Sequence, residues 1–133
     1  MTLQALTEVK LITPVKGRGL LSKEFIQKGT ILDIAHVLLF SNKDEEKIRE
    51  TLINKFTFEW KDPNNGSDYQ AALAMSPCEF MNHSYNPNVA YEKNYQEKTI
   101  KFYTLRDITS GEELTINYNG KLNKLDPMWI EFV

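Results

Sequence analysis

Cysteine is almost absent from this sequence, because Cys78 is the only one in 133 residues. A single cysteine excludes an intramolecular disulfide and supplies no thiolate cluster for zinc. Histidine is also scarce, with only His36 and His83, and neither has cysteine partners at zinc-ligand spacing. We therefore expect no bound metal and a reducing compartment.

An excess of one charge, a leader segment and long apolar runs are also lacking. The formal net charge is only -2, which gives no broad basic field for nucleic acid. No stretch approaches the ~20 apolar residues that cross a bilayer, and the N-terminus has neither the basic start nor the apolar run of a secretion signal. Apolar content of 41% and charged content of 26% are typical of a folded globular protein. We expect one domain over residues 1–133 with no direct nucleic-acid partner and no membrane partner. The expected location is the cytoplasm, and the nucleus or delivery as an effector stay open as alternatives.

Hydrophobic periodicity predicts a mainly β fold. Short runs rich in β-branched and apolar residues are typical of strands. They occur at residues 8–12, 30–40, 99–105 and 113–118. Dense turn chemistry at 62–68 predicts an exposed loop. These short strands, joined by turns, indicate several small sheets.

One helix is expected, over residues 41–56. Asn42 is a plausible N-cap, and Glu45 stands three residues later, where it can complete a capping box. An apolar stripe recurs every four residues at Ile48, Leu52 and Phe56.

The first motif with possible chemistry is Lys16-Gly17-Arg18-Gly19-Leu20. Its glycines allow either a tight turn or a close approach of a ligand to the backbone. It is no nucleotide fingerprint, because the third glycine and the following helix are absent. By itself, the motif leaves both readings open.

Two further motifs follow. Asn82-His83-Ser84, with Asn86-Pro87-Asn88 after it, concentrates hydrogen-bonding side chains behind the apolar pair Phe80-Met81. Buried Asn and His need partners, which an Asx-rich turn or a polar ligand can both supply. The third motif, residues 111–118, turns into a strand that ends at Tyr118, and a strand tyrosine is by default a packing residue.

In this order and spacing the three motifs resemble the SET-domain family of protein-lysine methyltransferases. The resemblance covers about residues 10–120 and leaves a short closing tail at 121–133. It implies a β-clip, SET-like fold of several small sheets with one inserted helix, in which the C-terminal strands are threaded beneath a loop as a pseudoknot. That threading would bring the Asn82-His83 segment and the Tyr118 strand around one site.

The same resemblance implies S-adenosylmethionine as cofactor and a protein bearing a target lysine as substrate. A histone or histone-like protein, a housekeeping protein and a host protein reached by an effector all fit. The residues that would border the cofactor are Lys16, Gly17, Arg18, Gly19, Leu20, Asn82 and His83, with Trp129 or Phe132 over the adenine. Tyr118 would orient the attacking amine, and Tyr91 would line the same channel and restrict it to monomethylation. A homodimer is also compatible with the resemblance.

The sequence departs from the family pattern at three places. Ser76-Pro77-Cys78 replaces a glycine pair, Phe56 stands where relatives often have Tyr, and Tyr85 stands where many have Cys. The leading hypothesis is an active enzyme. The alternatives are a non-catalytic SET-like module that binds peptide or cofactor, and a structural β-domain without a cofactor.

Overall fold

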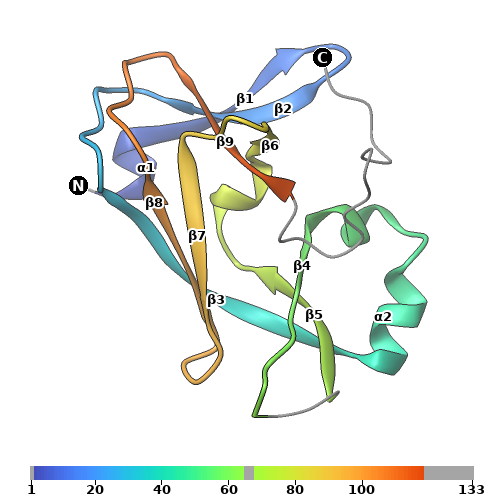
Figure 1. Cartoon of the computed structure of the whole chain (residues 1–133). Helices are drawn as coiled ribbons and strands as arrows, with labels where there is room; N and C mark the ends of the chain where they lie inside the picture. Colours follow the sequence, from blue (N-terminus) through green and yellow to red (C-terminus); the bar gives the residue numbers. More distant parts are fainter. Residues whose placement is uncertain (1, 65–67, 119–133) are drawn as a thin grey trace.

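A computed structural model describes residues 2–64 and 68–118 of the chain, which form many short strands with few helical turns (Figure 1). The elements follow one another as α1 (Leu3–Leu6), β1 (Thr7–Thr13), β2 (Gly17–Ser22), β3 (Ile31–Ser41), α2 (Asn42–Ile48), the 3₁₀ helix η1 (Leu52–Phe56), β4 (Thr57–Glu59), β5 (Tyr69–Ala74), the 3₁₀ helix η2 (Pro77–Phe80), β6 (Asn82–His83), β7 (Val89–Asn94), β8 (Thr99–Thr104) and β9 (Glu113–Ile116).

The strands form two sheets. One has the order β1-β2-β9-β6 and the other the order β4-β5-β3-β8-β7. Pairing is antiparallel throughout, except that β6 runs parallel to β9. Figure 1 shows β9, the last described strand, running between β2 and β6. Segments that are far apart in the sequence therefore meet at β9.

The expected mainly β, SET-like fold of several small sheets is confirmed. Its core is continuous, and the largest side chains that are almost completely buried include Trp60, Phe58, Phe102, Leu20, Met81, Leu114 and Ile116. Leu114 and Ile116 alternate along β9 with the half-buried Glu113 and Thr115, as a strand with one face in the core requires. The core thereby fixes which side chains of β9 face away from it.

The helix prediction over 41–56 was right in place but wrong in extent and in its cap. Ser41 is the N-cap, since its extended backbone lets its hydroxyl accept from the Asp44 amide. Glu45 binds the Arg49 guanidinium one turn later instead of returning to the cap. The helix ends at Ile48, because the Thr51 hydroxyl and amide both bond to the Ile48 carbonyl.

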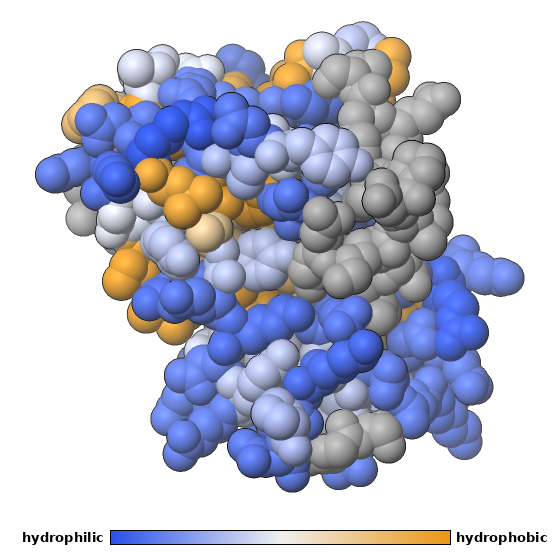
Figure 2. Space-filling view, in the orientation of Figure 1, coloured by the Kyte–Doolittle hydropathy of each residue, from blue (hydrophilic) through white to orange (hydrophobic). Residues whose placement is uncertain are grey.

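Two smaller expectations also need correction. The strand expected to reach Tyr118 ends at Ile116, so Tyr118 stands just beyond β9. The one-turn helix α1 was missed because four residues give too little periodicity; the Thr2 hydroxyl caps it by accepting from the Ala5 amide. None of the helices in the described ranges has the length and apolar content needed to cross a bilayer. The face in Figure 2 is mostly hydrophilic, with apolar patches between polar side chains.

Candidate active site

The parallel pair of β6 and β9 builds the candidate site. In its register Asn82 lies opposite Thr115 and His83 opposite Ile116. Tyr118 follows β9 and returns to β6, where its amide donates to Nδ1 of His83 at 2.9 Å and its hydroxyl donates to the Met81 carbonyl at 3.0 Å. The structure thus brings the Asn82-His83 segment and Tyr118 together.

Two side chains of this cluster have shifted acid–base properties. Burial, followed by the negative charges of Glu79 and Glu113, raises the pKa of Tyr118 to about 12. Its phenol is therefore neutral at physiological pH and serves as a hydrogen-bonding group, not as a base. Burial lowers the pKa of His83. Since Nδ1 of His83 accepts a hydrogen bond, the proton of its neutral ring lies on Nε2.

The Asn82 side chain connects the edge strand β6 to its neighbour β9 and to β2 beyond it. Its amide nitrogen donates to the Arg18 carbonyl at 3.2 Å and to the Glu113 carboxylate at 2.7 Å. A Cβ atom at Gly19 would come within 2.8 Å of the Asn82 amide nitrogen and of a Glu113 oxygen. A residue with a Cβ atom at position 19 would therefore collide with its neighbours, which explains the glycine. Gly17 has a φ of +79° with open space around it, which is the turn conformation.

A cavity of about 280 Å³ opens beside this cluster. The described residues that line it come from four regions of the chain: Lys16, Arg18, Leu52, Lys55, Phe56, Glu79, Phe80, Asn82 and Tyr118. Lys16 forms an ion pair with Glu113, and the Arg18 guanidinium lies 4.7 Å from the centre of the Phe80 ring. The cavity thus combines cationic, acidic, amide, phenolic and aromatic groups.

The remaining predicted residues lie around this cluster at different depths. The side chain of Leu20 is completely buried in the core, so only its backbone can meet a ligand. The Tyr91 hydroxyl donates to the Asn117 carbonyl at 3.2 Å, next to Tyr118, while its ring packs against Phe58. Tyr91 is not among the described residues that line the cavity. Trp129 and Phe132 lie outside the described residues.

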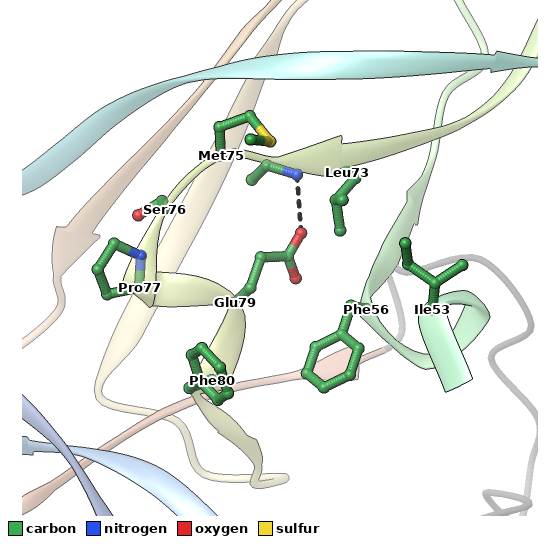
Figure 3. A pocket seen from close by; sticks show the side chains of 9 residues that line it. Ile53, Phe56, Leu73, Met75, Ser76, Pro77, Glu79 and Phe80 are labelled. Carbon is green, nitrogen blue, oxygen red and sulfur yellow. Dashed lines mark hydrogen bonds between the residues drawn. The ribbon is translucent and has the colours of Figure 1, made fainter. Parts of the chain in front are cut away.

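A second, larger cavity of about 470 Å³ adjoins the first. Its described lining is mostly apolar and is drawn in Figure 3, with Ile53, Phe56, Leu73, Ala74, Met75, Ser76, Pro77, Glu79 and Phe80. Phe56, Glu79 and Phe80 line both cavities. These three residues therefore form a wall between the two cavities.

The residues that depart from the family pattern help to shape this wall. Phe56 belongs to it, with a ring but no hydroxyl. The Ser76 hydroxyl caps η2 by accepting from the Cys78 amide at 3.1 Å, and Cys78 is completely buried. Burial, as the largest influence, raises the pKa of the Cys78 thiol to about 12, so the thiol is unreactive.

Sequence analysis missed Glu79, Glu113 and Lys55 as parts of this site. Glu79 interrupts the apolar run of residues 77–81, and an acid in such a run is a signal that could have been used. Glu113 belongs to the third motif, but its contact with Lys16 spans 97 positions. No local pattern predicts a pairing of that length.

Comparisons with known proteins show the family of this chain. The SET domain family model matches residues 17–119. A Schizosaccharomyces pombe protein named histone-lysine N-methyltransferase, H3 lysine-37 specific, is 34% identical over 120 residues, which cover 90% of this chain and 74% of that protein. A second protein of this yeast, histone-lysine N-methyltransferase set5, is 27% identical over 84% of this chain and 42% of its own length.

Solved structures show the same fold. A crystal structure of a Plasmodium falciparum protein, described as a proposed histone methyltransferase, has a TM-score of 0.65 and 20% identity, and covers 90% of this chain and 97% of that chain. A chain of ctPRC2, in an autoinhibited conformation bound to S-adenosylmethionine, has a TM-score of 0.71 and 22% identity over 90% of this chain and 16% of that one. At these sequence identities, the similarity to the two structures shows the fold alone.

Proposed function

Because this chain belongs to the SET-domain family of protein-lysine methyltransferases, we propose that it transfers the methyl group of S-adenosylmethionine to the ε-amine of a lysine in a protein substrate. The observation that carries this proposal is the position of Tyr118. Its amide bonds to His83 of β6 and its hydroxyl to Met81, directly before β6, at the edge of the cavity that Lys16, Arg18 and Asn82 also line.

The smaller cavity suits this cofactor chemically. S-adenosylmethionine carries a carboxylate, an ammonium group, a cationic sulfur and an aromatic base. Lys16, Arg18 and Lys55 can meet the carboxylate, and Phe56 or Phe80 offers an aromatic face. When bound, the cofactor supplies a methyl group that its cationic sulfur makes electrophilic. The two motif residues Asn82 and His83, with the backbone of residues 16–20, would hold it.

Tyr118 would orient the lysine amine. Its O–H donates to the Met81 carbonyl, which leaves the phenol oxygen able to accept an N–H of the amine and to aim the nitrogen lone pair. A lysine has an ordinary pKa of ~10.4, and leaving water for this site would lower it, so that the amine becomes neutral. Holding the reacting atoms in line is the main task of the protein here.

Tyr91 would line the lysine channel next to Tyr118. Its hydroxyl bonds to the carbonyl of Asn117, directly before Tyr118, so the two tyrosines are coupled through one stretch of backbone. A second phenol at this depth would hold an amine proton or a water and leave little room for added methyl groups.

We propose a histone or histone-like protein as the substrate, because the two similar yeast proteins are named histone-lysine methyltransferases. The test is incubation of the chain with methyl-labelled S-adenosylmethionine and either purified core histones or a whole-proteome extract, followed by mapping of modified lysines. Label on histone lysines supports the proposal. Label confined to other proteins would reject the histone substrate only. Tight cofactor binding in calorimetry without transfer to any lysine would favour the non-catalytic binding module.

A further inference from the structure

The larger cavity has one feature that the transfer chemistry does not use. Among the described residues that line it, Glu79 is the one charged side chain, and the others are apolar or small. Glu79 is only 6% exposed. Figure 3 shows its carboxylate beneath β5, with Leu73 and Phe56 on one side and Pro77 on the other. A carboxylate buried in an apolar wall favours a positively charged occupant.

The position of this carboxylate is fixed. One of its oxygens accepts a hydrogen bond from the Ala74 amide at 2.8 Å, at the end of β5. Its charge also reaches beyond the cavity, since it contributes to the raised pKa of Tyr118. Glu79 thus presents a fixed negative charge close to the site of transfer.

The two cavities differ in the charge of their linings. The smaller one has Lys16, Arg18 and Lys55 around it, which favour an anionic group. The larger one combines aliphatic and aromatic walls with a single negative charge. Lysine and arginine side chains match such a lining, because their long stems pack on apolar surface while the charged end meets an acid. Tyr118 lines only the smaller cavity, so a cation in the larger one is not the amine that reacts.

We propose that the larger cavity binds a second basic side chain of the protein substrate, one that flanks the target lysine and meets Glu79. This inference rests on the proposed function. The common wall of Phe56, Glu79 and Phe80 places the pocket where a neighbour of the target residue would lie. Glu79 then determines specificity: the enzyme prefers a lysine beside another basic residue.

A peptide library with one central lysine tests this. Each flanking position in turn carries arginine or citrulline, which has nearly the same shape without the charge. We expect the wild-type chain to methylate the arginine peptide at least about tenfold more efficiently, by kcat/KM, at one flanking position. In Glu79→Gln the ratio should fall close to one, and the carbonyl oxygen of the glutamine can still accept from the Ala74 amide. The matched control Glu97→Gln, at an exposed glutamate, should keep the preference.

The outcomes separate this inference from the proposed function. Methylation with equal rates for arginine and citrulline at every flanking position overturns the inference alone, and so does a Glu79→Gln variant that keeps the preference. The wild-type comparison remains decisive if that variant does not fold. Failure to methylate lysine in any peptide or extract protein overturns both.

Discussion

At the scale of single residues, Tyr118 combines a structural and a chemical task. Its phenol stays protonated, because burial and neighbouring carboxylates raise its pKa to about 12. We predict that Tyr118→Phe lowers kcat at least about a hundredfold, since the group that aims the amine is lost. The affinity for S-adenosylmethionine should change little, because the amide of residue 118 still bonds to His83. Methyl transfer and titration calorimetry measure the two effects separately.

The control for this substitution is Tyr103→Phe. Tyr103 lies on β8 in the other sheet, with the Lys101 ammonium near its ring. Losing this hydroxyl should leave transfer close to the parental rate. A Tyr118→Phe variant that works as fast as Tyr103→Phe would show that the phenol at 118 has no part in the reaction.

Tyr91 gives a prediction about the product. Because its ring is held by Phe58 and its hydroxyl by the Asn117 carbonyl, the phenol cannot swing away to admit a larger amine. The product should therefore be mainly monomethyl-lysine, and Tyr91→Phe should raise the share of dimethyl-lysine. Mass spectrometry of the product peptides decides this. Mainly trimethyl-lysine from the wild-type chain would refute it.

At the scale of elements, strand β2 contains two glycines with different roles: Gly17 has a positive φ, and Gly19 lies close to neighbouring side chains. In Gly19→Ala the new methyl group would lie 2.8 Å from side-chain atoms of Ile12, Asn82 and Glu113, so these side chains must move. We expect cofactor affinity to fall at least about tenfold, because Asn82 then no longer holds its place between β2 and β9.

Gly17→Ala is the matched control. Its cost comes from the positive φ alone, about 1 kcal/mol, since a methyl group there meets nothing within 4 Å. Thermal unfolding should reveal this small loss, while calorimetry should show nearly unchanged cofactor binding. Equal cofactor affinities for the two variants would mean that the close approach at Gly19 does not matter for binding.

The helices and strands also show how much of the fold local sequence patterns can predict. Strands such as β8 and β9 could be predicted because alternation along a strand follows directly from which face is buried. The helix over 41–56 was predicted too long, because its apolar period continues through Thr51, whose extended backbone separates α2 from η1. The motif residues Asn82 and Tyr118 could be predicted from their resemblance to a family. Glu79 could not, because its importance depends on which cavities it borders.

At the scale of the whole molecule, Asn88 ties the turn after β6 to β9. Its amide nitrogen donates to the Glu113 carbonyl at 2.9 Å and its amide oxygen accepts from the Thr115 amide at 2.8 Å. Asn88 is only 2% exposed, so its removal leaves buried backbone groups without partners. We predict that Asn88→Leu lowers the free energy of unfolding by about 3 kcal/mol, measured by urea denaturation. The exposed Asn86→Leu should change it by less than about 1 kcal/mol, and equal losses would contradict this role.

Acid should destabilise the fold in two stages. In the first, burial lowers the pKa of His83 in the folded chain, whereas the unfolded chain has the ordinary value of 6.5. Below pH 6.5 the unfolded chain therefore binds a proton that the folded chain resists, and the free energy of unfolding falls with pH. Protonation would also remove the acceptor that Nδ1 of His83 offers to the Tyr118 amide.

The second stage belongs to Glu112. Burial alone would raise its pKa, but hydrogen bonds from the Thr109 amide and the Asn88 side chain, together with the charge of Arg106, lower it below the ordinary 4.5. Its contribution is therefore complete above pH 4.5 and is lost as pH falls through the lower folded value. Urea midpoints between pH 8 and about 2.5 should decline in both stages. His83→Gln should remove only the first, because the group that titrates near pH 6.5 is gone, whereas the exposed His36→Gln should keep it. A wild-type urea midpoint at pH 5.5 equal to that at pH 7.5 would mean that folding does not lower the pKa of His83.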